Sequence, residues 1–266
     1  MRANSTADTV EATRIVKCLE RGIREVLGDG LLGLYLDGSL ALGGFDAASD
    51  VDFVAVTERP VDDAVFARLQ SMHDRLAQME SPLAEQIEGV YATAEAVRTG
   101  ATMPHRVPNI ERGRGERLKW ISLGGPWWLI HQAVLREHGV VLHGPKPATF
   151  IGPIPRDVLS GHMRAMLLDM QASFNSESPT PINRGYQSYM VLTLCRIAYT
   201  LHTGAIASKA AAAEWATGHW GERWRPLIEA ATRDRHQPAG SAAPANVDAT
   251  RELLTWLLIA APDAGA

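Results

Sequence analysis

The chain has 266 residues, 46% of them hydrophobic, which is enough to bury one large core or two smaller ones. A formal net charge of −4 does not fit a general nucleic-acid binder, so nucleic acid is not expected as a partner. The first residues lack the apolar stretch of a secretory signal, and no apolar run reaches the roughly 20 residues of a membrane span. The two cysteines, Cys18 and Cys195, fit no metal-binding spacing and no expected disulfide. We therefore expect a cytoplasmic protein without a membrane partner.

The first half of the sequence alternates between helix and strand patterns. Apolar residues at helical spacing predict a helix over 8–27, which the sequence "GDG" ends. Short apolar segments predict strands over 31–36, 49–56 and 83–92, with a helix over 61–79 between the second and third.

The middle of the sequence is less regular. Residues 99–119 are rich in Gly, Pro and Arg and predict a long connection, either functional or mobile. A helix is predicted over 126–139, with Pro at its start and Gly at its end. The sequence "VVLHGP" after it predicts a short strand that leads into a turn.

After residue 151 the pattern becomes helical. Helices are predicted over 158–174, 186–203, 208–218, 224–235 and 247–259, with a flexible linker over 237–246. The chain is therefore predicted to hold an α/β N-terminal domain over 1–150, a mixed sheet with flanking helices, and an all-α C-terminal helical bundle over 151–266.

The segment "LDGSLALGGFDAASDVDF" (36–53) combines two small motifs. Asp50 and Asp52 alternate along a predicted strand, so they share a face about 7 Å apart at about 3.4 Å per residue. Two such carboxylates repel unless a cation lies between them, and Mg²⁺ typically takes one or two carboxylates together with phosphate oxygens and water. Gly38 and Ser39 open a short helix, where backbone N–H groups face an anion. Each motif alone is common on surface turns, but their joint order predicts a nucleotide and magnesium site.

The stretch "GSLALGGFDAASDVD" resembles the Gly-Ser and Asp-x-Asp pattern of the DNA-polymerase-β-like nucleotidyltransferase superfamily. Its spacing is more narrowly similar to the aminoglycoside adenylyltransferases that modify streptomycin and spectinomycin. The segments "LREHGVVLHGP" (135–145) and "VLTLCRIAYTLHTGAIASKAAAAEWA" (191–216) also resemble that family.

The resemblance implies that the chain is an O-nucleotidyltransferase. It also implies that the N-terminal domain is a nucleotidyltransferase domain and that the helical bundle follows it. Such an enzyme moves AMP from Mg²⁺-bound ATP to a hydroxyl group of a small molecule, here an aminoglycoside or aminocyclitol. We expect a monomer that transfers AMP directly, since no nucleophile for a covalent intermediate is evident. Two alternatives stay open: another acceptor, such as tRNA, a protein or a different metabolite, and a nucleotide-binding module without turnover.

The resemblance also assigns roles to residues of the N-terminal half. Asp50 and Asp52 would hold Mg²⁺ and the ATP phosphates, and Glu88 would be the general base toward the acceptor hydroxyl. Glu85, on the opposite strand face, is the alternative base, and either glutamate is otherwise an ordinary surface residue. Ser39 and Ser49 would contact phosphates, or cap helices instead.

Two cations of the helical half, Arg196 and Lys209, would bind phosphates by the same resemblance. Ser208 is a plausible N-cap, which puts Lys209 in the first turn of a helix, where a cation is unfavourable by about 0.3–1 kcal/mol. A bound triphosphate would reverse that sign. The alternatives are a surface lysine and an arginine that forms an ion pair on the helix flank. With both halves contacting ATP, the active site would lie between the domains.

Several positions depart from the family pattern. Arg117 stands where the family has tryptophan, and the uncharged Ile182 and Tyr186 stand where its acids would meet ammonium groups. Asp37 replaces the usual Tyr or Arg before Gly38, and we expect a solvated acid that ends a strand or weakly repels phosphate. His131, His138 and His143 are expected to be structural, and Trp120, Trp127, Trp128 and Trp215 to be core or cleft-wall residues. The sequence thus indicates the donor half of the reaction and leaves the acceptor open.

Overall fold

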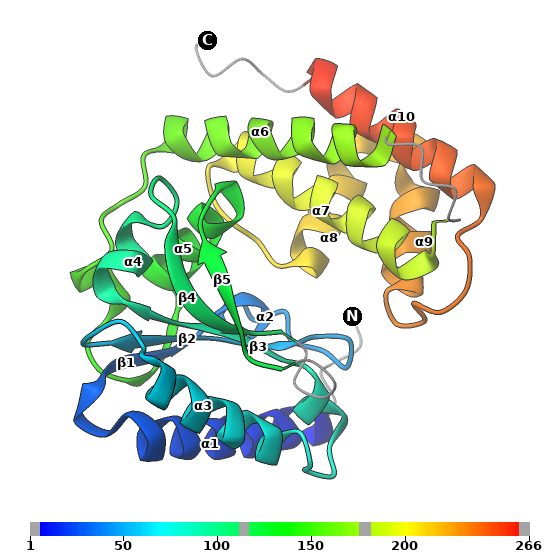
Figure 1. Ribbon diagram of the computed structural model, residues 1–266. Helices are drawn as coiled ribbons and strands as arrows, with labels where there is room; N and C mark the ends of the chain where they lie inside the picture. Colours follow the sequence, from blue (N-terminus) through cyan, green and yellow to red (C-terminus); the bar gives the residue numbers. More distant parts are fainter. Residues whose placement is uncertain (1–5, 112–116, 176–181, 261–266) are drawn as a thin grey trace. The chain divides into compact units, whose positions relative to one another are not determined.

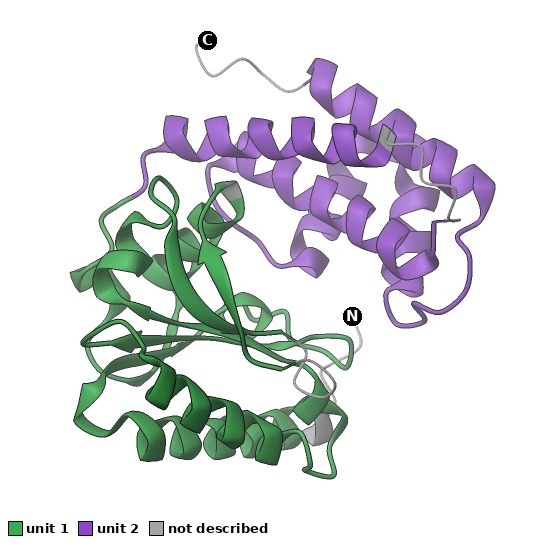
Figure 2. Ribbon diagram, in the orientation of Figure 1, with its two compact units in different colours: residues 1–153 green, residues 154–266 purple. Residues whose placement is uncertain are grey.

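The computed structural model describes residues 6–111, 117–175 and 182–260 (Figure 1). The chain divides into two compact units, Met1–Pro153 and Ile154–Ala266 (Figure 2), so the division lies close to the predicted domain boundary. Within the described ranges, no helix combines the length and the apolar character that crossing a membrane requires.

The first unit is built on a mixed six-stranded sheet with the strand order β5-β4-β3-β2-β1-β6. The β2–β3 pair is parallel, and the other four pairs are antiparallel. The strands are β1 (Leu31–Leu36), β2 (Val51–Thr57), β3 (Ile87–Thr93), β4 (His105–Ile110), β5 (Lys119–Leu123) and β6 (Val140–His143). The predicted α/β unit with a mixed sheet is confirmed.

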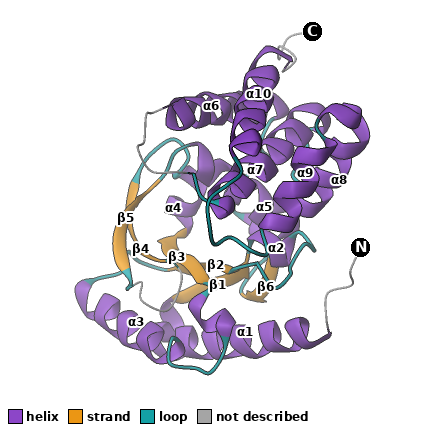
Figure 3. Cartoon of the chain, turned by 90° about the vertical axis from the view of Figure 1, so that its right-hand side faces the viewer, coloured by secondary structure: helices purple, strands orange, loops and turns teal. Residues whose placement is uncertain are grey.

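Helices cover both faces of this sheet (Figures 1 and 3). Helices α1 (Thr6–Leu27) and α3 (Asp63–Leu76) pack on one face, in a core that includes Phe53 and Ala55 of β2. Helices α4 (Ala94–Thr99) and α5 (Pro126–His138) pack on the other face, in a core that includes Val54 and Val56. Alternate residues of β2 therefore belong to different cores, as the two-residue period of a strand requires.

The structure corrects the prediction of a long connection over 99–119, because β4 and β5 form a hairpin there. Pro108 lies within β4 and pairs with Trp120, and the strand carries few apolar residues. Sequence patterns of this kind argue against a strand, but pairing at the edge of an existing sheet stabilises one. Residues 112–116 of this segment lie outside the described part of the chain.

The second unit is helical, as predicted. Its helices are α6 (Arg156–Asn175), α7 (Arg184–Thr203), α8 (Lys209–Trp220), α9 (Arg225–Asp234) and α10 (Pro244–Ala260). Helix α7 contacts the other four, and most of its side chains are buried. The Asn183 side chain caps its start at the Tyr186 N–H, and Gly204, with φ of 77°, ends it in the left-handed conformation.

Candidate active site

Three acidic residues lie side by side across neighbouring strands of the first unit. Asp37 follows β1, Asp52 lies on β2 and Glu88 lies on β3. The Asp37 N–H donates to the Asp52 carbonyl at 3.0 Å, and Asp52 is the ladder partner of Glu88. All three share the sheet face of Val54 and Val90, which α5 covers. We call Asp37, Asp52 and Glu88 the acidic row; its members sit about 4.8 Å apart from strand to strand.

A pocket of about 380 Å³ lies over the acidic row. Its polar and aromatic lining comes from three places: Asp37, Asp52 and Glu88 of the row, Asn109, Glu111 and Lys119 of the β4–β5 side, and Trp127, Trp128 and His131 of α5. The residues predicted as a metal ligand and as the general base therefore open into one pocket of the first unit.

Asp50, the other predicted metal ligand, lies just before β2. The strand begins at Val51, whose N–H donates to the Gln86 carbonyl at 2.7 Å. Asp52 is thus fixed in the ladder, whereas Asp50 is half-buried in the turn that precedes it and is not among the described residues that line the pocket.

Gly38 is required at its position for two reasons. Its φ is 56°, a region that residues with a side chain adopt at a cost. A Cβ atom at Gly38 would also overlap the Asp52 carboxylate. The short helix α2 (Gly38–Ala41) starts here, as predicted, and the buried Ser39 hydroxyl has no hydrogen-bond partner in the described structure. The loop therefore packs directly against Asp52 and offers a hydroxyl group to a ligand.

Ser49 has a different place from Ser39. Its hydroxyl donates to Asp46 Oδ1 at 2.9 Å and accepts from the Asp46 N–H at 3.0 Å. The residue is buried and stabilises the turn that precedes β2, rather than capping a helix. Its predicted contact with phosphate stays a prediction.

The two candidate bases, Glu85 and Glu88, differ in their local structure. Glu85 lies in a 3₁₀ turn, Pro82–Glu85, which Ser81 caps by accepting from the Leu83 N–H. The strand begins only at Ile87, so the comparison of two strand faces does not apply to Glu85. Glu88 lines the pocket, which favours it as the group near a reacting hydroxyl.

Asp37 is not the solvated acid that the sequence suggested. It is 1% exposed, because the sheet and α5 cover it, and its Oδ2 lies 2.5 Å from His131 Nδ1. The His131 ring stacks on Trp128, with centroids 5.6 Å apart, and Trp128 donates to the Val97 carbonyl. His131 therefore belongs to the pocket, and sequence reasoning missed it. One sequence signal could have predicted the burial of Asp37: at two residues' distance it shares the strand face of Tyr35, which is buried.

Arg117 and Trp120 both contact helix α3. Arg117, in the position of the family's tryptophan, pairs with Asp74 of α3 at 3.0 Å. Trp120 stacks on Phe66 at 4.9 Å between centroids, and Cζ of Arg106 lies 4.1 Å from the centroid of the Trp120 ring. Trp120 is consequently held in a surface cluster and does not line the pocket described above.

The two predicted cations of the second unit gather at one loop. Ser208 caps α8, as predicted, by accepting from the Ala211 N–H at 3.3 Å, so Lys209 is the first helical residue. Arg196 Nε of α7 donates to the Ala207 carbonyl at 3.1 Å, and Lys209 Nζ lies 5.8 Å from the centre of the Tyr189 ring. Both cations thus flank the connection between α7 and α8.

The acids fit magnesium held together with a phosphate. Among the described residues, no three His, Cys, Asp or Glu side chains form a group that would enclose a metal ion. Mg²⁺ does not need such a cage, because it keeps waters and binds through one or two carboxylates plus substrate phosphates. Asp52, with Asp50 two residues before it, and the unpartnered Ser39 hydroxyl supply that kind of open set.

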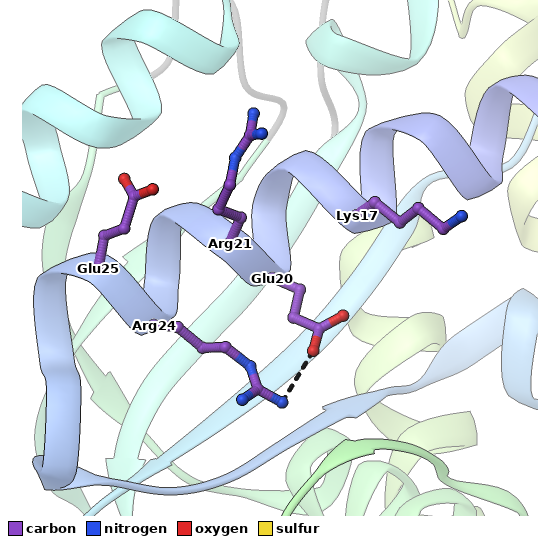
Figure 4. A pocket seen from close by; sticks show the side chains of 5 residues that line it. All are labelled: Lys17, Glu20, Arg21, Arg24 and Glu25. Carbon is purple, nitrogen blue, oxygen red and sulfur yellow. Dashed lines mark ion pairs between the residues drawn. The ribbon is translucent and has the colours of Figure 1, made fainter.

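A second hollow lies on the outer side of α1 (Figure 4). It is lined by Lys17, Glu20, Arg21, Arg24 and Glu25, and Glu20 pairs with Arg24 at 2.9 Å. Charges of both signs alternate along this helix face, which is typical of a solvated surface. The helix covers the sheet face opposite the acidic row, so the hollow is no part of the candidate site.

Comparison with known proteins finds similar sequences for both units. The family model "Aminoglycoside adenylyltransferase, C-terminal domain" matches residues 150–255. An aminoglycoside (3'') (9) adenylyltransferase of Klebsiella pneumoniae is 28% identical over 229 residues, which cover 83% of this chain and 82% of that protein. A spectinomycin 9-adenylyltransferase of Staphylococcus aureus is 25% identical over 205 residues, 73% of this chain and 74% of the relative.

The fold also has a solved counterpart. The crystal structure of the spectinomycin adenyltransferase AAD(9) from Enterococcus faecialis, with ATP and spectinomycin, matches with a TM-score of 0.72. The match covers 93% of this chain and 99% of that chain at 18% sequence identity. The sequence matches extend over both units, and they support the resemblance to the aminoglycoside adenylyltransferases that the motifs indicated.

Proposed function

We propose that this protein transfers AMP from Mg²⁺-bound ATP to a hydroxyl group of an aminoglycoside or aminocyclitol of the streptomycin or spectinomycin type. The names of its relatives support this activity, and the matched structure contains ATP and spectinomycin. The observation that carries the proposal is the direct pairing of Asp52 with Glu88 in one pocket, with Gly38 packed against the Asp52 carboxylate.

In the proposed reaction Glu88 accepts the proton of the acceptor hydroxyl. The acceptor oxygen then forms a bond to the α-phosphorus, the bond from that phosphorus to the bridging oxygen breaks, and pyrophosphate leaves with the electron pair. Asp50 and Asp52 would hold Mg²⁺, which when bound offsets the charge of the phosphates and of the leaving group. A base aligned with the hydroxyl contributes about 10²–10⁴-fold to such reactions.

The remaining predicted residues are proposed as phosphate ligands. The Ser39 hydroxyl is buried and without a hydrogen-bond partner in the described structure, so a phosphate oxygen would satisfy it. Arg196 and Lys209 are proposed to bind phosphate oxygens, and Ser49 to act through the turn that it shares with Asp46. Affinity measurements on variants of these residues test the roles one at a time.

The decisive experiment mixes the protein with ATP, Mg²⁺ and a panel of aminoglycosides and aminocyclitols, and searches for AMP adducts by mass spectrometry. We expect an adduct with at least one acceptor, and a Glu88→Gln variant that binds ATP but loses about 10²–10⁴-fold in transfer. Glu85→Gln is the matched control and is expected to retain transfer. An absence of adducts with every acceptor of this class would refute the proposed substrate, and full activity of Glu88→Gln would refute its role as the base.

A further inference from the structure

The acidic row contains one carboxyl oxygen that the proposed reaction does not use. The Asp37 side chain is 2% exposed and lines the pocket over the row. Its Oδ2 bonds to His131, but its Oδ1 is buried and has no hydrogen-bond partner in the described structure. An acceptor left in that state costs about 1–3 kcal/mol. An oxygen of this kind on a residue that lines a pocket therefore points to a ligand that supplies the missing partner.

The chemistry of this oxygen restricts the partner. An ionised carboxylate oxygen accepts hydrogen bonds or binds a cation, so an organic ligand that satisfies it directly must bring an O–H or an N–H group. Phosphate oxygens are also acceptors and carry the same sign of charge, which excludes the triphosphate from this position. Ser39, two residues further along the chain, has the opposite property, because its buried hydroxyl can donate to a phosphate oxygen. Within the segment 37–39, Ser39 can thus contact a phosphate oxygen, and Asp37 can contact a hydrogen-bond donor of the ligand.

His131 holds the Asp37 carboxyl in one orientation. Its Nδ1 lies 2.5 Å from Oδ2, and its ring is fixed by the stack on Trp128, whose indole N–H donates to the Val97 carbonyl at 3.0 Å. With Oδ2 bound in this way, rotation of the carboxyl group would break the hydrogen bond. The direction of the other oxygen, Oδ1, is thereby fixed as well, as hydrogen-bonding neighbours fix the carboxylates that bind ligands.

We propose that Asp37, positioned by His131, binds a hydroxyl group of a polyhydroxylated ring in this pocket. This rests on the proposed function, because that reaction brings two such rings to the acidic row: the ribose of the nucleotide and the ring of the acceptor. The contact joins residues 94 positions apart, from the end of β1 and from α5, at the wall of the pocket that holds Asp52 and Glu88.

The test compares Asp37→Leu with the wild type and with Asp29→Leu, a control at the other end of β1. Calorimetry measures the affinity for a Mg²⁺-bound non-hydrolysable ATP analogue and for its 2′-deoxy and 3′-deoxy forms, and steady-state kinetics separates KM of the acceptor from kcat. If the ribose is the partner, Asp37→Leu binds the analogue about tenfold more weakly and no longer discriminates one deoxy form from the parent. If the acceptor ring is the partner, its KM rises by a similar factor and nucleotide affinity is unchanged.

His131→Phe provides a second measurement that does not depend on the folding of Asp37→Leu, since phenylalanine keeps the stack on Trp128. We expect His131→Phe to change the same quantity as Asp37→Leu, either the nucleotide affinity or the KM of the acceptor, by a smaller factor. The exposed control His138→Phe should change neither the nucleotide affinity nor the KM. The inference is overturned if both variants keep the wild-type discrimination and KM, or if they weaken only tripolyphosphate or Mn²⁺ binding. A wild-type protein that binds no nucleotide and forms no adduct would instead overturn the proposed function itself.

Discussion

His73 should make the stability of the first unit depend on pH. The ring lies in α3, is 2% exposed and shares a hydrogen bond of 2.7 Å between its Nε2 and the Tyr91 hydroxyl. It also stacks on Phe53 at 6.1 Å between centroids. Burial lowers the pKa of His73 from 6.5 to about 4, against a smaller opposing effect of Asp74. The folded protein thus keeps this histidine neutral at pH values where the unfolded chain protonates it.

The sign and size of the effect follow from linkage. Above pH 6.5 His73 is neutral in both states, and its burial has no pH-dependent cost. As the pH falls from 6.5 to about 4, only the unfolded chain binds the proton, so the free energy of unfolding decreases. At about 1.4 kcal/mol for each pH unit, the loss across this interval is about 3 kcal/mol.

The measurement uses urea unfolding at several pH values between neutral and about pH 4 for the wild type and for the double variant His73→Leu/Tyr91→Phe. Removing both partners avoids leaving a buried hydroxyl group without a hydrogen bond. We expect the difference in stability between the two proteins to change by about 3 kcal/mol over this range, because the remaining titrating groups are common to both. A difference that stays constant with pH would refute the idea that His73 remains neutral in the folded state.

Three further variants and one matched control test the predicted roles of residues in both units. Gly38→Ala is expected to strain the backbone by about 1–3 kcal/mol and to displace the Asp52 carboxylate, so that calorimetry shows a loss of Mg²⁺-bound ATP affinity. Gly43→Ala is its matched control, since φ there is 66° but no atom lies within 4 Å of the added Cβ; equal losses in both would show that strain alone is responsible. Lys209→Ala is expected to bind the ATP analogue about tenfold more weakly, and unchanged affinity would make this residue an ordinary surface lysine. Arg117→Ala removes an exposed ion pair, so it should cost about 0–1 kcal/mol in thermal unfolding and leave AMP transfer unchanged.

Local sequence signals determined several of the elements that carry the candidate site. The apolar run 31–36 gave β1 its bounds, and Gly38 and Ser39 opened a helix at the predicted place. Ser208 capped α8 as its hydroxyl and position indicated. These features depend on neighbours within a few residues of the chain, so the sequence carries them directly.

Only the tertiary structure decided what surrounds these elements. The hairpin of β4 and β5 exists because the sheet offers an edge to pair with, although Pro108 lies in its first strand. Register alone puts Asp52 beside Glu88, since shifting either strand by one residue would turn its acid to the opposite face.

The pairing of Asp37 with His131 shows the same limit most clearly. The two residues are 94 positions apart, and no sequence motif around either one predicted that they are in contact. The packing of α5 on the sheet buried the carboxyl group and converted an apparent strand-end acid into part of the pocket. The sequence by itself thus determined that a short helix opens at Gly38 directly after β1, and it predicted a nucleotide-binding role for that loop. Long-range pairing and burial decided which side chains meet there, because those forces act between residues that are remote in the chain.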